Sequence, residues 1–438
     1  MSRTYRVAVV GLGKIGLPLA AQIASKGHTV IGCDIRDEVV ASVNAGHSHI
    51  EEEPGLAEAV RDAVAAGRLT ATTDTASAVG RSQVVMVIVP VVVTPDKRPD
   101  YRSLDAALRS VGKGIQNEAL VIVETTLPVG ATRNHAAPIV EHESGLVCGE
   151  GFWLAFSPER LYAGRVFQDL VRYPKIVGGV DDESTRRAVE FYRAWLEAEV
   201  RPVANAETAE FAKLAETTYR DVNIALANQL AVYGGSRGAD AKEAFDAANS
   251  QPFSHLHRPG IGVGGHCIPV YPHFMLSDST DGELDLVRVA REVNDGMAAR
   301  SLNWLDSALG GLAGRRVLVL GLSYREDVKE LSFSTALTLI DQLRRAGATV
   351  LAHDPHFTAA ELADLEVELV DLNTDVKVDA AIIQAFHREY RTLDWARLEG
   401  LQVVLDGRGG FDAAPLRARG VKVISVAQPP AGDRSGQR

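Results

Sequence analysis

The stretch YRVAVVGLGKIG, residues 5–16, decides the fold of this chain. An apolar run of strand length ends at Gly11, and helical spacing begins at Ile15. In such a strand–turn–helix unit, Gly11 permits the tight turn and Gly13 lets the backbone approach a pyrophosphate. Gly16 allows the helix to pack closely on the strand. The stretch therefore predicts a dinucleotide-binding unit, with a simple packing turn as the alternative.

Asp34 ends the next predicted strand, at residues 29–35, where a carboxylate would bind a ribose diol. Its charge would repel the extra phosphate of NADP, so we expect NAD, although Arg36 points mildly the other way. Free N–H groups at the helix N-terminus would hold the phosphates. The candidate cofactor-binding residues are Gly11, Gly13, Lys14, Ile15, Gly16, Asp34, Arg36, Pro90 and Thr126.

The rest of the chain predicts an α/β protein with two Rossmann-like domains, each a doubly wound parallel sheet, joined by a helical middle. Strands and helices alternate up to about residue 204, and a long helix is expected at 207–233. Another helix is expected at 284–309, and alternation resumes after the glycines near 312. We therefore predict domains at 1–204, 205–312 and 313–427, followed by a disordered tail at 428–438.

Composition excludes several classes of protein. The chain has 438 residues and a net charge of −11, which argues against coating nucleic acid or an anionic membrane. Three cysteines are too few for a disulfide framework and favour a reducing cytoplasm. No apolar stretch approaches eighteen residues, so we expect no membrane span, and we expect no metal site.

A second motif, PGIGVGGHCIP at residues 259–269, places Cys267 after four glycines. We expect the glycines to bring backbone close to a ligand, and the thiol to lie beside a helix N-terminus that favours the thiolate. The alternative, a buried structural thiol, is assigned to Cys33 and Cys148. A nicotinamide site together with a nucleophilic cysteine indicates oxidation beyond the aldehyde, through a thiohemiacetal and a thioester to a carboxylate.

The chain resembles the UDP-glucose/GDP-mannose dehydrogenase family over nearly its whole length. The resemblance rests on VAVVGLGKIGLPLA, VETTLPVGAT, FSPERL, AEFAKLAETTYRDVNIALAN and RPGIGVGGHCIPVYP. The GHC motif at 265–267 and the RDVN motif at 220–223 are most similar to the branch acting on UDP-N-acetylhexosamines, mannosamine or glucosamine.

The resemblance assigns roles to five residues. Cys267 matches the nucleophile, and Lys213 matches a lysine that stabilises the developing oxyanion; an ion pair with Glu210 is the alternative for Lys213. Thr126 would position a water, and Glu159 would relay protons during thioester hydrolysis. The alternatives for these two are a turn before proline and a solvated loop carboxylate. Thr217 stands where glucose-oxidising members carry asparagine.

The substrate site is also implied by the resemblance. Arg325 would replace a family lysine as phosphate partner. Arg408 would pair with substrate or with the partner loop, and a surface arginine is the alternative. The family's hydrolytic aspartate is replaced by Tyr271, and a second glutamate by Ala163. The candidate substrate-binding residues are Glu159, Arg160, Leu161, Lys213, Arg220, His257, Gly260, Gly264, Gly265, His266, Tyr324, Arg325 and Arg408.

The function that the resemblance implies is the NAD-dependent, four-electron oxidation of C6 of a nucleoside-diphosphate hexose to the uronate. Two NAD would be used per turnover, and the long helix would form a homodimer. The product would enter a cell-surface polysaccharide or a glycosylated secondary metabolite. Three alternatives stay open: a UDP- or dTDP-glucose 6-dehydrogenase, a non-catalytic NAD or nucleotide-sugar sensor, and a two-electron dehydrogenase of the 6-phosphogluconate type.

Overall fold

The computed structural model describes residues 4–430, and its contacts divide the chain into two compact units. The first unit runs to Glu216 and also holds His273–Ser277. The second contains Thr217–Pro272 and the residues from Asp278 onward. The tail expected at 428–438 lies outside the described residues from position 431.

The first unit is built around an eight-stranded sheet. Its strand order is β10-β9-β8-β7-β4-β1-β2-β3, so the chain enters in the interior and winds outward in both directions, as a doubly wound sheet does. The strands are β1 Arg6–Val10, β2 Thr29–Cys33, β3 Leu69–Thr72, β4 Val84–Val87, β7 Ala119–Val123, β8 Phe152–Phe156, β9 Lys175–Gly179 and β10 Val200–Pro202. A small antiparallel pair, β5 Val92–Val93 and β6 Pro99–Asp100, lies outside it.

Two groups of helices cover this sheet. α1 packs with α3 and α7, whereas α5 packs with α4 and α6. Val7, Ala8 and Val9 of β1 are all fully buried, which a strand covered on both faces requires. The helices are α1 Gly16–Ser25, α2 Asp37–Asn44, α3 Leu56–Ala65, α4 Thr75–Val79, α5 Arg102–Gly114, α6 Ala137–Ser144, α7 Val166–Arg172 and α8 Asp182–Arg193, with a π-helical turn at Thr132–Ala136 before α6.

One edge of the sheet departs from the parallel arrangement expected for it. β9, which contains the predicted strand at 176–177, runs antiparallel to β8, with Ala155 opposite Gly179. β10 then pairs in parallel with β9. The direction of a strand depends on where the preceding segment re-enters the sheet. The composition of an apolar run is the same for both directions, so it does not predict which one the strand takes.

The second unit contains a six-stranded sheet in which every pair is parallel, in the order β13-β12-β11-β15-β17-β18. It repeats the strand, glycine turn, helix and strand of the N-terminus, so the prediction of two Rossmann-like sheets is confirmed. Its elements are β11 Arg316–Leu320, α13 Thr335–Arg345, β12 Thr349–His353, β13 Glu368–Leu369, β15 Ala380–Ile383, β17 Val403–Asp406, α14 Ala414–Ala418 and β18 Lys422–Ser425, with a pair β14 Val376–Lys377 and β16 Leu398–Glu399.

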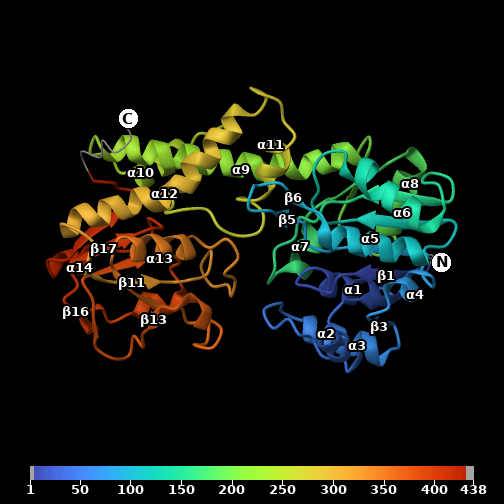
Figure 1. Cartoon of the computed structure of the whole chain (residues 1–438), viewed down its shortest axis with the longest axis horizontal. Helices are drawn as coiled ribbons and strands as arrows, with labels where there is room; N and C mark the ends of the chain where they lie inside the picture. The colour runs from blue at the N-terminus through green and yellow to red at the C-terminus, as the bar shows by residue number, and fades with distance from the viewer. Residues whose placement is uncertain (1–3, 431–438) are drawn as a thin grey trace. The chain divides into compact units, whose positions relative to one another are not determined.

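Helices dominate the segment between the two sheets. α9, Ala206–Gly235, is one unbroken helix of 30 residues, drawn in green in Figure 1, and it confirms the helix expected at 207–233. α12, Asp285–Leu309, likewise confirms the helix expected at 284–309. Two shorter helices, α10 Ala241–Ala248 and α11 Tyr271–Leu276, complete the segment.

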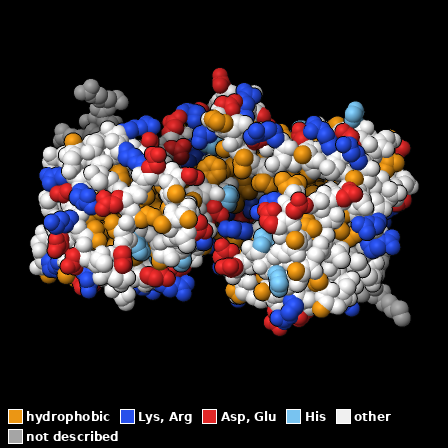
Figure 2. Space-filling view, turned by 60° about the horizontal axis from the view of Figure 1, so that its bottom comes forward, with side chains coloured by type: hydrophobic (Ala, Val, Ile, Leu, Met, Phe, Trp, Pro, Cys, Tyr) orange, Lys and Arg blue, Asp and Glu red, His pale blue; other side chains and the backbone are white. Residues whose placement is uncertain are grey.

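Charged side chains of both signs are visible on the surface (Figure 2). Figure 2 shows acidic and basic side chains intermingled on the face in view. Among the helices that the structure describes, none combines the length and the apolar character needed to cross a membrane.

The turn between β1 and α1 is fixed by close backbone contact. Gly11 has a φ of +99° and donates its N–H to Cys33 O at 2.8 Å. A Cβ on Gly16 would lie 1.8 Å from Gly11 O, a distance that no side chain can occupy. A Cβ on Gly13, in contrast, would meet nothing within 4 Å. The first sheet and its first helix can therefore meet only through Gly16, whereas Gly13 borders open space.

We expect Gly16→Ala to lower the free energy of unfolding by about 1–3 kcal/mol, because the added methyl overpacks the turn. Gly13→Ala is the matched control and should be close to wild type in stability. Chemical denaturation of the two variants measures the difference. Equal stabilities would mean that the Gly11–Gly16 contact does not hold α1 against the sheet.

Candidate active site

The N-terminal glycine turn has the features of a dinucleotide site. α1 begins without any side-chain cap. Pro18 has no N–H and the Leu17 N–H donates to Gly13 O at 3.2 Å, so the first turn offers the Gly16 N–H to phosphate oxygens. Gly13 and Lys14 are exposed beside them, and Gly13 leaves room for close approach. Ile15 is half-buried against the core, and Pro90 is exposed after β4.

Asp34 lies beside this turn, just after β2. Its carboxylate accepts the Leu12 N–H at 3.1 Å and the Arg36 N–H at 3.1 Å. The Arg36 Nε lies 3.4 Å from the same carboxylate, and half of its side chain is exposed. One acid therefore ties the glycine turn to the end of β2. A carboxylate in this place and an uncapped helix fit the ribose and the pyrophosphate of NAD.

The loop after β7 is joined to α9 through Glu210. The buried Glu210 carboxylate accepts the N–H groups of Gly130, at 2.5 Å, and Thr132, at 2.7 Å, and the Thr132 hydroxyl at 2.6 Å. Burial raises the pKa of Glu210 to about 7 against these hydrogen bonds. The acid that the sequence offers as an ion-pair partner for Lys213 thus serves to hold this loop.

Three candidate catalytic residues, Thr126, Lys213 and Thr217, are buried. Thr126 follows β7 and is 4% exposed, and Lys213 on α9 is 6% exposed. Thr217, one helical turn after Lys213, is fully buried on the same side of α9. A lysine ammonium is a group that stabilises an oxyanion developing on a substrate.

Glu159 follows β8 and is not the solvated loop carboxylate that its sequence alone suggests. Its side chain is 13% exposed, and Oε1 accepts the N–H groups of Arg160, at 2.5 Å, and Leu161, at 2.8 Å. Oε2 accepts a hydrogen bond from Lys175 Nζ at 3.0 Å. The Arg160 guanidinium is paired with Glu216 on α9, Nε to Oε2 at 2.7 Å.

Lys175 and Glu124 are site residues that the sequence analysis does not single out. Lys175 Nζ also lies 3.0 Å from Glu124 Oε1, and the Tyr192 hydroxyl donates a hydrogen bond to the same oxygen. The available signal was a charged residue at the end of an apolar strand, since Glu124 directly follows β7 and Lys175 begins β9. It does not reveal the pairing, because the two residues come from separate strands.

In the second unit, the glycines of the cysteine loop pack against protein rather than bordering open space. A Cβ on Gly264 would lie 2.7 Å from Phe333 O, and one on Gly265 would lie 2.9 Å from the Tyr324 ring. The Gly265 N–H also donates to Ser332 O at 3.2 Å. The missing side chains of Gly264 and Gly265 therefore admit the loop after β11, and their contact with a ligand stays a prediction.

Cys267 lies in the turn that leads into α11. It is half-buried, and its carbonyl accepts the Tyr271 N–H at 2.9 Å. The thiol therefore precedes this short helix, as the sequence predicts, although α11 has only six residues. His266 is half-exposed, with Nε2 3.4 Å from Glu330 Oε2.

Arg220 and His257 come together in the second unit. The His257 N–H donates to Asn223 Oδ1 at 2.9 Å. Burial and the nearby Arg220 guanidinium lower the pKa of His257, which keeps its ring neutral. The neighbouring Gly260 N–H donates to Asn228 Oδ1 at 2.9 Å. Two asparagines of α9 thus hold the start of the cysteine loop.

The two arginines of the C-terminal sheet support Tyr324. Arg325 Nε donates to the Tyr324 hydroxyl at 3.0 Å. Arg408 donates to Tyr324 O at 2.8 Å and to Gln384 O. The structure thus brings Tyr324, Arg325 and Arg408 together with Gly264 and Gly265.

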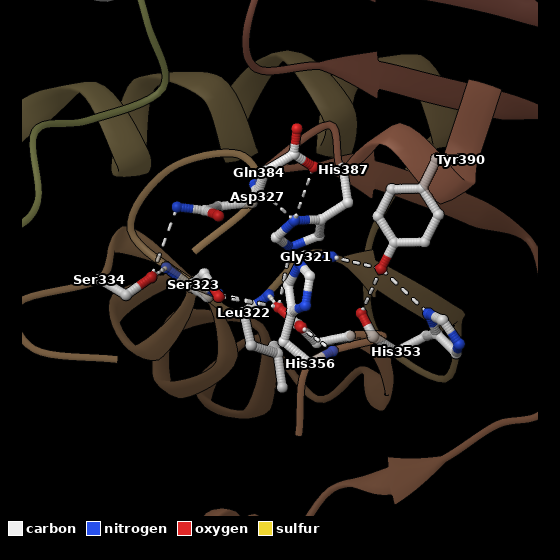
Figure 3. A network of polar contacts seen from close by, with 12 residues as sticks. Gly321, Leu322, Ser323, Asp327, Ser334, His353, His356, Gln384, His387 and Tyr390 are labelled. Carbon is white, nitrogen blue, oxygen red and sulfur yellow. Dashed lines mark hydrogen bonds and ion pairs between the residues drawn. The ribbon is translucent and has the colours of Figure 1, made fainter. Parts of the chain in front are cut away.

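The second Rossmann-like sheet has an acid in the same position as Asp34, but this acid is sealed. Asp354 follows β12, and its Oδ2 accepts hydrogen bonds from the Leu322 N–H, from the N–H and hydroxyl of Ser323, and from His387 Nε2 (Figure 3). These contacts outweigh burial and lower the pKa of Asp354 to about 2. Its side chain is fully buried, so no ribose can reach it.

His387 also belongs to a group of metal-ligand residue types with Asp327 and His356, whose ligand atoms lie within 4.8 Å of one another. Both of its ring nitrogens are already used, because Nδ1 accepts the Asp327 N–H at 3.0 Å while Nε2 donates to Asp354. The group therefore acts as a structural network (Figure 3).

Comparison with known proteins also gives the two Rossmann-like sheets different ligands. Models of the UDP-glucose/GDP-mannose dehydrogenase family match the chain in three parts: the NAD binding domain at residues 5–196, the central domain at 207–296 and the UDP binding domain at 318–413.

Individual relatives cover almost the whole chain. A UDP-N-acetyl-D-mannosamine dehydrogenase of Pyrococcus horikoshii is 35% identical over 418 residues, which are 94% of this chain and 97% of the relative. A solved UDP-D-ManNAc dehydrogenase structure from Pyrococcus horikoshii has a TM-score of 0.87 at 32% identity and covers 97% of this chain and 99% of its own. A UDP-glucose dehydrogenase structure from Pyrobaculum islandicum has a TM-score of 0.86 at 30% identity and covers 97% and 98%. The chain therefore belongs to the UDP-glucose/GDP-mannose dehydrogenase family.

Proposed function

We propose that this protein is an NAD-dependent nucleotide-sugar 6-dehydrogenase that oxidises the C6 alcohol of a UDP-N-acetylhexosamine to the carboxylate. The observation that carries the proposal is the combination, in one chain, of an open dinucleotide turn with a loop-held Cys267. NAD supplies the hydride acceptor for two successive oxidations, so two NAD are consumed per turnover. Family membership and the substrates of the relatives support the same reaction.

The chain's own residues divide the remaining chemistry. Cys267 Sγ adds to the C6 aldehyde carbon and forms a thiohemiacetal, which the second oxidation converts to a thioester. Lys213 stabilises the negative charge that develops on the C6 oxygen, with the Thr217 hydroxyl as a second donor. Thr126 positions the water that cleaves the thioester, and Glu159 accepts a proton from that water.

Residues of the second unit favour an N-acetylhexosamine as the sugar. Arg220 and the neutral His257 ring lie together, and His266 precedes the nucleophile. An acetamido group at C2 offers a carbonyl acceptor and an N–H donor to such side chains. His257 Nε2 is buried and has no hydrogen-bond partner among the described residues, and a sugar that left it unpaired would bind less well by about 1–3 kcal/mol. The overall fold does not discriminate, because the UDP-glucose dehydrogenase structure superposes about as well.

The long helix α9 is our candidate for a homodimer contact. It carries exposed large hydrophobic residues over its length: Phe211 at 53%, Tyr219 at 54%, Leu226 at 46%, Leu230 at 38% and Tyr233 at 60%. A second copy of this chain would cover them.

Sedimentation of the wild type and of Leu226→Glu tests the dimer contact. The wild type should be a dimer and the variant a monomer, because the added charge would be buried in the contact. A monomeric wild type would contradict the proposal.

We further propose that the protein works in the cytoplasm and supplies a uronate to a surface polysaccharide or to a glycosylated secondary metabolite. Three unpaired cysteines and a need for NAD support the first part.

Replacement of the nucleophile tests the covalent route. Cys267→Ser should abolish uronate formation while NAD still binds, because a serine hydroxyl does not form the thioester that the second oxidation yields. Cys148→Ser is the matched control, since that thiol has no role in the mechanism. Mass spectrometry of the product and calorimetric titration of NAD measure the two effects. Wild-type release of uronate by Cys267→Ser would remove this thiol from the reaction.

A substrate panel tests the sugar. Efficiency, as kcat/KM, should be at least about tenfold higher with UDP-N-acetylmannosamine or UDP-N-acetylglucosamine than with UDP-glucose or dTDP-glucose. An advantage for either glucose nucleotide would contradict the assigned sugar but leave the 6-dehydrogenase standing. No NADH from any sugar, with NAD and the sugar both bound, would identify a sensor.

A further inference from the structure

A buried group of three charged side chains lies in the first unit, formed by Glu124, Lys175 and Glu159. We call it the carboxylate–lysine triad. Lys175 Nζ is 3.0 Å from Glu124 Oε1 and 3.0 Å from Glu159 Oε2. The Lys175 side chain is 8% exposed, Glu124 is fully buried and Glu159 is 13% exposed. The Glu159 N–H also donates to Glu124 O at 3.2 Å, so the backbones of the two glutamates are tied together.

The two carboxylates of the triad are not equivalent. Glu159 Oε1 accepts two backbone N–H groups, and Oε2 accepts the lysine, so all of its contacts favour a negative charge. Glu124 Oε1 accepts the Tyr192 hydroxyl and the lysine, but its buried Oε2 has no hydrogen-bond partner among the described residues. An ionised oxygen in that position would be costly, whereas a protonated one would not.

Charge balance leads to the same assignment. One ammonium compensates one carboxylate, so burying both glutamates ionised would leave an uncompensated charge. Burial raises the pKa of Glu124 to about 7 despite Lys175. Burial also acts to raise the pKa of Glu159, but Lys175 and the backbone N–H groups outweigh it, and the net pKa is lowered. The triad therefore holds its proton on Glu124 and its negative charge on Glu159.

We propose that Lys175 is a positioning residue that fixes the Glu159 carboxylate in its basic form for thioester hydrolysis, with protonated Glu124 and Tyr192 anchoring the ammonium. The proposal rests on the function proposed above for Glu159. In that step, water oxygen bonds to the thioester carbonyl carbon and one water proton passes to Glu159. The C–S bond then breaks, and its electron pair goes to Cys267 Sγ.

The other charged groups near Glu159 do not replace Lys175. The Arg160 guanidinium is turned to Glu216 on α9 and to Pro174 O. Tyr192 on α8 donates to Glu124 and lies under Lys175, with Nζ 5.2 Å from its ring centroid. On α7, Asp169 is paired with Arg165 at 3.1 Å. Lys175 Nζ, in contrast, is in direct contact with the Glu159 carboxylate, at 3.0 Å.

The pH dependence of turnover tests the proposal. In Lys175→Met, the acidic limb of kcat should move upward by about one to three pH units, because Glu159 loses its compensating cation. Below that limb, hydrolysis should become limiting, so a burst of two NADH per site should precede slow turnover while intact-protein mass spectrometry shows an acylated Cys267. Lys175→Arg keeps the charge and should restore most of the wild-type profile.

Lys26→Met is the matched control. It removes an ion pair of 2.6 Å with Glu197 from the same unit, where both side chains are partly exposed. Its profile should equal that of the wild type. An unmoved acidic limb in Lys175→Met, or an equal shift in Lys26→Met, would overturn the proposal.

A direct titration keeps the proposal testable if Lys175→Met does not fold or if the wild type oxidises no nucleotide sugar. Carbon-13 labelling of glutamate carboxyl groups in the wild type, assigned with Glu124→Gln and Glu159→Gln, reports both midpoints by NMR. Glu124 should titrate near pH 7 and Glu159 below its ordinary value. The reverse order would overturn the proposal, whereas absence of NADH from the wild type with any sugar would overturn only the proposed function.

Discussion

The structure depends on places where backbone must approach a neighbour more closely than any side chain allows. In the first unit this place is the contact between Gly16 and Gly11 O, which seats α1 on β1. The seat leaves the N-terminus of α1 uncapped beside Asp34, and both features are needed to hold a dinucleotide. In the second unit, Gly264 and Gly265 admit Phe333 O and the Tyr324 ring. There the missing side chains of two glycines let the cysteine loop pack against the loop after β11.

The two Rossmann-like sheets show how one topology is specialised by the contacts of a single acid. Asp34 and Asp354 both follow the second strand of their sheet and both hold the preceding glycine turn. Asp354 is surrounded by Ser323, His387 and backbone donors and is fully buried. Asp34 keeps 9% of its side chain exposed. Only the first acid can therefore meet a ribose, in agreement with the separate NAD and UDP binding domains of the family.

Much of this arrangement can be predicted from local sequence. The turn at Gly11, the acid at Asp34 and the long helix α9 follow from short-range spacing, which glycine chemistry and helical periodicity determine. The antiparallel direction of β9 and the pairing of Lys175 with Glu124 could not be predicted, because each depends on how distant strands meet. The contact of Gly264 with Phe333 O could not be predicted for the same reason. A glycine reports that something approaches closely, but its sequence does not say whether that is ligand or protein.

In the proposed four-electron oxidation, the protein captures an aldehyde and never releases it. The most direct measurement is the number of NADH formed for each sugar consumed, determined with limiting UDP-N-acetylmannosamine, excess NAD and an aldehyde trap in solution. We expect two NADH and one uronate for each sugar, with no trapped aldehyde. One NADH for each sugar, with the aldehyde recovered in the trap, would contradict it and identify a two-electron dehydrogenase.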